Sequence, residues 1–236
     1  MRPWIVPVLL AAVYCGMARA EEGDVPARVA ASCPAAAAWI KANAVQQAKS
    51  RDSSRTFSEP ALRTALQQHA DRDQQARDAL IAVGMDLGSK EAKAVQQVDA
   101  TNLAWLKSVI ARSGFPTPEQ VGIQGVTNAW LLVQHADSDP TFQSHVLGLL
   151  EPRAHDGTIR PSDYAMLVDR VRTNHGKPQL YGSQFVGDAA KPSDMHLSPV
   201  EDPAHLDERR ARMGLMPIHD YECALRAMYA TAPAPK

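Results

Sequence analysis

The sequence is poor in the residues that mark several common classes of protein. Only 6% of its 236 residues are aromatic, and only three are cysteine. It has no cluster of lysine and arginine and no ladder of aromatic side chains, so we expect no nucleic-acid partner. The H-E-x-x-H, C-x-x-C and P-loop patterns are also missing, so the sequence identifies no resident metal and leaves any cofactor unknown.

The first 20 residues have the layout of a signal peptide. Arg2 supplies a positive charge and residues 5–16 form an apolar stretch. Ala18 and Ala20 are small residues at the two positions that a signal peptidase reads. The apolar stretch is too short for a comfortable membrane span. We therefore predict cleavage after Ala20 and an exported chain, periplasmic or secreted, with no transmembrane segment once the peptide is removed.

Two cysteines, Cys33 and Cys223, remain in the predicted mature chain. An exported protein meets an oxidising compartment, where an even pair of cysteines indicates a disulfide. Such a bond would join the first mature helix to the last. The alternative is two separate buried thiols. Cys15 suggests a lipoprotein, but Tyr14 is bulky where a lipidation signal needs a small residue, so we expect no lipid.

Helix start and stop signals follow one another along most of the chain. Proline, serine, threonine or aspartate stands where a helix would begin, with Ser58 and Asp202 expected as N-cap residues. Thr117 and Gln120 have capping-box spacing over what we expect to be a very short helix. These signals predict helices at about 34–49, 60–83, 89–114, 117–120, 129–136, 140–153, 161–175, 203–213 and 217–229.

The predicted fold is mainly α: a single-domain helical bundle with a small β-hairpin or extended segment near residues 179–200. Segments 180–186 and 195–200 would form the two arms of that hairpin. Residues 21–32 carry no pattern and are expected to be a loose lead-in. The expected divisions are a signal peptide (1–20), an N-terminal helix with its lead-in (21–57), a helical domain (58–229) and a disordered tail (230–236).

A dense polar corner follows the most apolar helix of the chain, in the run A-W-L-L-V-Q-H-A-D-S-D-P-T-F-Q. His135, Asp137 and Asp139 fall between this helix and the next, and Gln143 lies in the first turn of the second helix. Asp139 before a proline is a common helix start. The corner is therefore either a set of capping groups with one satisfied histidine, or part of a functional site.

Two long helices place charges on their apolar sides. Asp73 and Arg77 share a stripe with leucines of the second predicted helix, and Asp99 and Asn102 share one with apolar residues of the third. A buried, unpaired carboxylate is strongly unfavourable. These groups either form a buried ion-pair and amide network that sets helix register, or they line a polar pocket completed by the corner at His135.

A second polar run is Q-L-Y-G-S-Q, from Gln179 to Gln184. Strand alternation would put Gln179, Tyr181 and Ser183 on one face and Gln184 on the other. Gly182 would allow a bulge or the close approach of another group. Ser183 is not in a G-x-S-x-G elbow, which argues against a hydrolase nucleophile. The alternative to a binding role is an amide-rich edge strand.

Several runs of sequence form a recognisable pattern. They are L-K-S-V-I-A-R-S-G-F-P-T from Leu106, A-W-L-L-V-Q-H-A-D-S-D-P-T-F-Q from Ala129, A-M-L-V-D-R-V from Ala165, G-K-P-Q-L-Y-G-S-Q-F from Gly176 and E-D-P-A-H-L-D-E-R-R-A-R-M-G-L from Glu201. Together they resemble a bacterial family known only as a domain of unknown function, number 6624. Its pattern is also matched at Asp73, Gln74, Arg77, Asp99 and Asn102. The resemblance covers about residues 73–221 and implies no established activity.

These features leave three hypotheses open, and the sequence does not decide whether the protein is an enzyme. The first is a binding module for a small molecule or a peptide end. The second is a hydrolase that uses His135 with Asp137 or Asp99 as acid–base partners, with or without a divalent metal. The third is a scaffold whose polar network has no ligand. The pocket of the first hypothesis would be lined by Asp73, Gln74, Arg77, Asn102, Gln143, Gln179, Tyr181 and Gln184.

Overall fold

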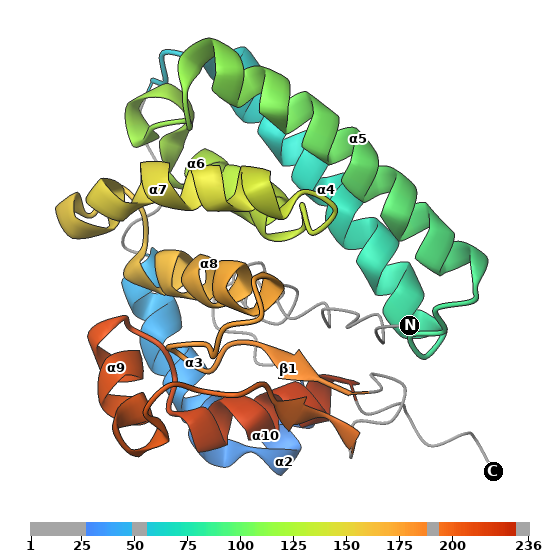
Figure 1. The fold of residues 1–236 in the computed structure, drawn as a ribbon, viewed down its shortest axis with the longest axis vertical. Helices are drawn as coiled ribbons and strands as arrows, with labels where there is room; N and C mark the ends of the chain where they lie inside the picture. Colours follow the sequence, from blue (N-terminus) through green and yellow to red (C-terminus); the bar gives the residue numbers. More distant parts are fainter. Residues whose placement is uncertain (1–26, 49–55, 188–193, 230–236) are drawn as a thin grey trace.

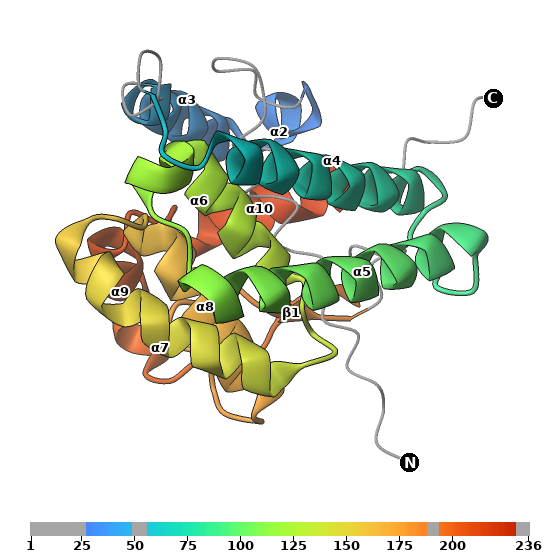
Figure 2. The ribbon, with the colours of Figure 1, turned by 90° about the horizontal axis from the view of Figure 1, so that it is seen from above.

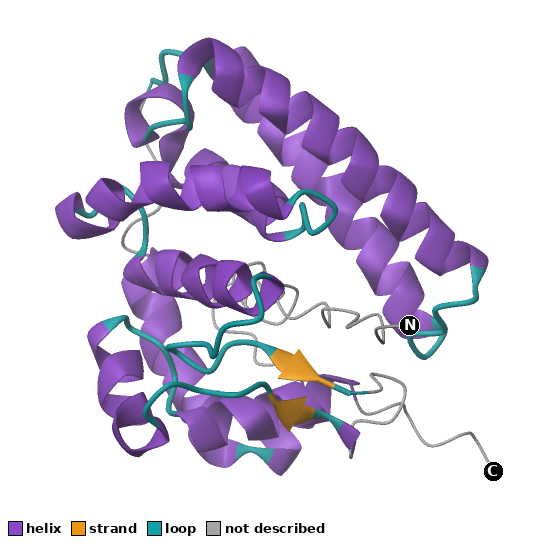
Figure 3. Ribbon diagram, in the orientation of Figure 1, coloured by secondary structure: helices purple, strands orange, loops and turns teal. Residues whose placement is uncertain are grey.

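The computed structural model describes residues 27–48, 56–187 and 194–229. The predicted signal peptide and the predicted tail lie outside these residues. Within them the fold is mainly α-helical, as predicted, with nine α-helices and one two-stranded antiparallel sheet (Figure 1, Figure 3). The elements are α2 (Ala27–Ser32), α3 (Pro34–Ala48), α4 (Pro60–Ala82), α5 (Lys90–Ser113), α6 (Pro118–Gln134), α7 (Pro140–Asp156), α8 (Pro161–Asn174), β1 (Phe185–Val186), β2 (His196–Leu197), the 3-10 turn η3 (Pro203–His205), α9 (Leu206–Arg212) and α10 (Ile218–Tyr229).

The helices form two connected groups. Helices α4 and α5 make a long antiparallel pair that extends beyond the rest of the bundle, and α6 packs against α4 (Figure 2). Helix α7 lies along α8, and the remaining helices and the small sheet lie on the other side of α8 (Figure 1). One hydrophobic core surrounds Trp130 among α4 to α8. A second surrounds Leu225 and is formed by α2, α3, α10 and the adjoining ends of α4 and α5. No helix of the described part is long and apolar enough to cross a membrane.

Several predicted helix starts are confirmed by their capping bonds. Ser89 and Asp139 each accept a backbone N–H from the first turn of the helix that follows, at 3.1 Å and 2.9 Å. Thr117 and Gln120 form the predicted capping box. The helix that they begin is longer than expected, because α6 continues through a kink at Gly122, whose φ is 74°.

Two local predictions are wrong, and a third is confirmed only in part. Residues Ala27–Ser32 form α2 instead of a loose lead-in, because Val29 is fully buried in the second core. Ser58 is not the N-cap of α4; Glu59 takes that position without a side-chain bond, and a proline at the first helical position leaves one donor fewer to cap. Asp202 does take the predicted N-cap position, but the expected capping bond is missing: its backbone is left-handed, with φ of 49°, and its side chain makes no cap bond to the 3-10 turn that follows.

The predicted hairpin exists but is shorter than expected. Strands β1 and β2 have two residues each, with Phe185 opposite Leu197. Residues 179–184 form a loop and not a strand, because Gly182 turns the backbone with a φ of 67°. The predicted alternation of side chains therefore does not apply to this run.

The predicted disulfide is confirmed. Cys33, at the junction of α2 and α3, is bonded to Cys223 of α10, 190 positions further along the chain. Helices α2 and α3 both pack on α10 around this bond. The N-terminal helices are thus attached covalently to the end of the domain.

Candidate functional site

A buried ion cluster joins α4 to the end of α6. The Asp73 side chain is fully buried, and its carboxylate accepts hydrogen bonds from Arg77 Nη1 at 2.8 Å and from Gln74 Nε2 at 2.7 Å. It also lies 2.9 Å from Nδ1 of His135, the C-cap residue that follows α6. Residues 73 and 77 meet because they are four apart on one helix face. The packing of α6 on α4 brings the histidine to them.

Arg77 links this cluster to α5. Its Nη2 donates to both carboxylate oxygens of Asp99, at 2.8 Å and 3.0 Å. Asp99 is the outer member of the cluster, since 25% of its side chain is exposed whereas Asp73 has no exposed side-chain surface. The guanidinium therefore holds one carboxylate inside the bundle and one at its edge.

The pKa values of the two carboxylates that bind Arg77 are shifted in opposite directions. Burial acts to raise the pKa of Asp73, but the opposing effects of His135, Arg77 and Gln74 lower it below its ordinary value. Burial raises the pKa of Asp99, and its bonds to Arg77 do not fully offset this. Asp73 is thus the anion on which the cluster is built, and Asp99 is the member that takes up a proton more readily.

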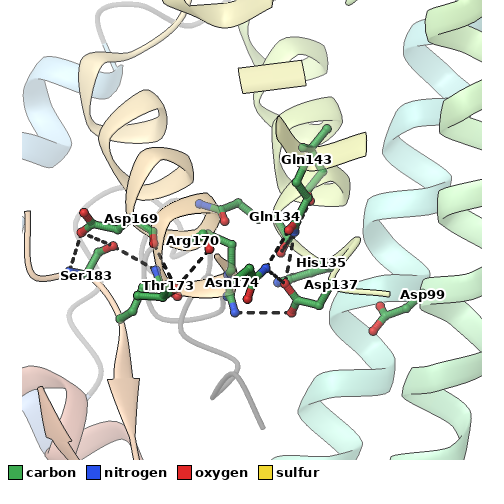
Figure 4. A network of polar contacts seen from close by, with 12 residues as sticks. Asp99, Gln134, His135, Asp137, Gln143, Asp169, Arg170, Thr173, Asn174 and Ser183 are labelled. Carbon is green, nitrogen blue, oxygen red and sulfur yellow. Dashed lines mark hydrogen bonds and ion pairs between the residues drawn. The ribbon is translucent and has the colours of Figure 1, made fainter. Parts of the chain in front are cut away.

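A second polar network fills the corner between α6, α7 and α8 (Figure 4). The Gln143 amide donates to the backbone carbonyl of Val133 at 3.0 Å and to Asp137 at 3.1 Å. Asn174 donates to the Gln143 side-chain oxygen at 2.8 Å. Arg170 reaches Asp137 only at 3.4 Å. Gln143 is therefore fully engaged, whereas Arg170 is held weakly.

Several members of these two networks, and Gln134 next to His135 in sequence, carry unpaired polar atoms. Among the described residues, both amide atoms of Gln134, Nε2 of His135 and the Nε atoms of Arg77 and Arg170 are buried without a hydrogen-bond partner. The exposed fraction of Gln134 is 1% and that of His135 is 5%. A buried donor or acceptor left unpaired costs about 1–3 kcal/mol, so several at one place call for an explanation.

The two networks meet at the end of α6. His135 belongs to the ion cluster, and Asp137, two residues further along the chain, belongs to the corner. Figure 4 shows Gln134 and Arg170 on the facing sides of α6 and α8. In the described part of the chain, two other buried atoms without a partner lie outside the two networks, namely Nδ2 of Asn102 on α5 and Oδ1 of Asp163 at the start of α8. The unpaired atoms of Gln134, His135 and Arg170 are those that belong to α6, its C-cap and the facing helix α8.

The Q-L-Y-G-S-Q run has a different set of partners. The fully buried carboxylate of Asp169 accepts the backbone N–H groups of Leu180, Tyr181 and Ser183 at 2.7, 3.0 and 2.9 Å. The Ser183 hydroxyl donates to the same carboxylate at 2.8 Å. Burial raises the pKa of Asp169, and these donors only partly oppose it. Asp169 thus holds the loop in its turned conformation.

The two glutamines of the run bind each other across the loop. Gln179 Nε2 donates to the carbonyl of Gln184 at 2.9 Å and to that of Ser198 at 2.8 Å, and Gln184 N–H donates to Gln179 Oε1 at 2.8 Å. Arg210 donates to the carbonyls of Tyr181 and Gly182. These described contacts hold the loop closed, and none of them joins the run to the ion cluster.

The predicted site residues therefore fall into four groups. Asp73, Gln74, Arg77, Asp99 and His135 form the ion cluster, and Asp137 and Gln143 lie in the corner. Asn102 instead accepts a bond from His69, 2.7 Å away, and this histidine stacks on Trp105. Gln179, Tyr181 and Gln184 belong to the loop held by Asp169.

Sequence reasoning missed four polar residues of the site region, three of them buried and the fourth, Asn174, exposed. They are Gln134, Asp169, Arg170 and Asn174. A signal for three of them exists in the helix period: Gln134 lies four positions after Trp130, and Asp169 and Arg170 lie four positions after Ala165 and Met166. The first residue of each of these pairs is buried, so the second shares a buried face.

The ion cluster also has the donor types of a metal site. Asp73, Asp99 and His135 each offer a ligand atom, and these atoms lie within 4.8 Å of one another. However, the guanidinium of Arg77 already binds both carboxylates. A metal ion would have to displace this cation. Asp139, the third acidic or histidine residue of the predicted corner, is not part of this cluster: it caps α7 and pairs with Lys107 at 2.8 Å.

Comparison with known proteins finds one family. The family model described as "Family of unknown function (DUF6624)" matches residues 60–232. No curated protein and no solved structure matches the chain. The matched range includes both polar networks and the loop held by Asp169, and leaves α2 and α3 outside.

Proposed function

We propose a function from the site itself, because the chain belongs to the family of unknown function DUF6624, whose description names no activity. The proposed function is that of an exported binding protein, which holds a small polar molecule or a peptide end between α4, α6 and α8. Export rests on the signal-peptide layout of the first 20 residues. The Cys33–Cys223 disulfide suits an oxidising compartment.

The observation that carries the proposal is the set of unpaired atoms on two consecutive residues. Gln134 presents one donor and one acceptor, and His135 presents Nε2, all of them buried. In most proteins buried polar groups have partners, either in the chain or in a bound molecule. A ligand with its own donors and acceptors would supply those that the chain lacks.

The ion cluster prepares one side of this site. His135 is oriented through Nδ1 by the Asp73 carboxylate, so Nε2 points away from Asp73. Asp73 in turn is held by Arg77 and Gln74. A side chain fixed by such supporting bonds loses little freedom on binding, which favours affinity.

The test is to identify what the purified chain carries. Protein isolated under native conditions is denatured, and the released small molecules are measured by mass spectrometry. We expect a stoichiometric polar compound from the wild type and from Gln96→Leu, an exposed glutamine of α5, but not from Gln134→Leu. The proposal is wrong if the wild type releases no compound and neither glycylglycine nor acetamide changes its melting temperature.

A second candidate, hydrolysis, is favoured by one feature. A neutral His135 that donates through Nδ1 to Asp73 has its basic nitrogen, Nε2, unpaired, which is the arrangement of a general base oriented by a carboxylate. The orienting residue would be Asp73 and not Asp137 or Asp99. Loss of hydrolytic activity in His135→Gln, with ligand binding retained, would distinguish this function from binding alone.

A further inference from the structure

Arg170 has fewer partners than its burial requires. Its exposed fraction is 1%, yet the only side-chain hydrogen bond described for its guanidinium is the 3.4 Å contact from Nη1 to Asp137. Its Nε is buried without a partner. A guanidinium has five N–H donors and stays charged at all relevant pH values. A buried charge with one long contact is unfavourable unless something else binds it.

The other charges around Arg170 do not supply that partner. The carboxylate of Asp169, its neighbour in sequence, is occupied by the loop at Tyr181 and Ser183. Tyr229 cannot serve as a counter-anion, because burial raises its pKa and it remains a neutral phenol. Asp137 is the one carboxylate described within reach, and it also accepts bonds from Gln143 and Asn174.

The Gln134 amide adds an unpaired donor on α6, the helix that packs against α8. Figure 4 shows Gln134 on α6 facing α8 and Arg170. A planar guanidinium binds a carboxylate well, because two parallel N–H groups match its two oxygens. The 29% exposure of the Asp137 side chain puts the outer edge of this region in contact with solvent.

From these contacts we propose that Arg170 and Gln134 form a carboxylate-binding subsite, which a ligand carboxylate enters by displacing Asp137 from Arg170. This inference rests on the proposed binding function and specifies its ligand as a carboxylate-bearing molecule, such as one with a peptide C-terminus. In the ligand-free protein the Asp137 carboxylate binds the Arg170 guanidinium weakly, in the place that the ligand carboxylate would take.

The proposal predicts opposite effects for two substitutions on the same pair. Arg170→Met keeps the length of the side chain and removes the anion site. The affinity of the Arg170→Met variant for a carboxylate should fall by about tenfold or more, which is the loss expected for one charge-assisted hydrogen bond. Asp137→Asn removes the competing anion, so carboxylate affinity should rise. Arg170→Lys keeps the charge without the planar fork and should retain part of the affinity.

The experiment measures thermal shifts of the purified chain with acetate, acetamide and glycylglycine at constant ionic strength. Arg112→Met, which removes an exposed arginine of α5, controls for net charge, and circular dichroism confirms that each variant is folded. We expect acetate and glycylglycine to raise the melting temperature of the wild type, Arg112→Met and Asp137→Asn, but not of Arg170→Met.

Two results would overturn the assignment. If acetamide binds as well as acetate, or if Arg170→Met still responds to acetate as the wild type does, the carboxylate subsite is wrong although the binding function stands. If neither acetate, acetamide nor glycylglycine shifts any folded variant, and no compound is released from the native protein, both proposals are wrong.

Discussion

Two buried glutamines of the same corner are expected to respond in opposite directions to the same substitution. Gln134 ends α6 and Gln143 lies in the first turn of α7, with exposed fractions of 1% and 0%. Neither amide atom of Gln134 has a hydrogen-bond partner. The Gln143 amide has partners on both its oxygen and its nitrogen. Leucine has a similar volume in both places, so the difference isolates hydrogen bonding from packing.

The expected magnitudes follow from these partners. Gln143→Leu removes the bonds to Val133, Asp137 and Asn174 and leaves the buried partners unpaired, which should lower the free energy of unfolding by about 2–4 kcal/mol. Gln134→Leu removes two buried polar atoms that have no bonds to lose. We expect the free energy of unfolding of the ligand-free protein to rise by about 1–2 kcal/mol.

The measurement is urea denaturation followed by circular dichroism, on protein that has been unfolded, dialysed and refolded so that no ligand remains. The midpoint should move up for Gln134→Leu and down for Gln143→Leu, with unchanged slopes. A functional site often lowers stability, and removal of its polar groups then stabilises the free protein. The gain in Gln134→Leu should therefore accompany loss of the bound compound.

One result would refute this reasoning. If Gln134→Leu lowers the free energy of unfolding as much as Gln143→Leu does, the Gln134 amide is bonded in the refolded, ligand-free protein, for example to buried water. Its atoms would then need no ligand, and the observation that carries the proposed function would be removed.

Three other predictions concern stability. Arg77→Met should lower the free energy of unfolding by about 3–5 kcal/mol in urea denaturation, because it leaves the buried carboxylate of Asp73 without its cation; an unchanged midpoint would contradict this. Asp163, in the first turn of α8, is buried, and burial raises its folded-state pKa above 3.8. The free energy of unfolding should therefore fall as the pH rises from 3.8 through the folded pKa, and Asp163→Asn should flatten that fall. Parallel curves of unfolding free energy against pH for the wild type and the variant would argue against it. Reduction of the Cys33–Cys223 bond opens a loop of 190 positions and should lower the free energy of unfolding by up to about 5 kcal/mol in the chain-entropy view, measured by denaturation with and without reductant.

Local chemistry made much of the helical fold predictable. Ser89, Asp139 and the Thr117–Gln120 box lie next to the backbone groups that they cap, so sequence spacing is enough to locate these helix starts. The failures at α2 and in the 179–184 loop have the opposite cause. Their conformations depend on distant groups, namely the second core for α2 and the Asp169 carboxylate for the loop.

The candidate site was predictable only in part. The helix period places Asp73 and Arg77 on a buried face, and the structure confirms their burial and their ion pair. The helix period does not predict that His135 pairs with Asp73, because these residues are 62 positions apart in the sequence. Nor does it show that Gln179 and Gln184 bind each other.

By itself the sequence determined most of the helices, which two cysteines could pair and the presence of charge inside the bundle, because these depend on caps, on counting and on the period of 3.6 residues. Only the tertiary structure decided which buried polar groups meet and which stay unpaired. A hydrogen bond forms or fails within a few tenths of an ångström, and the positions of α4, α6 and α8 to that precision result from the packing of the whole core.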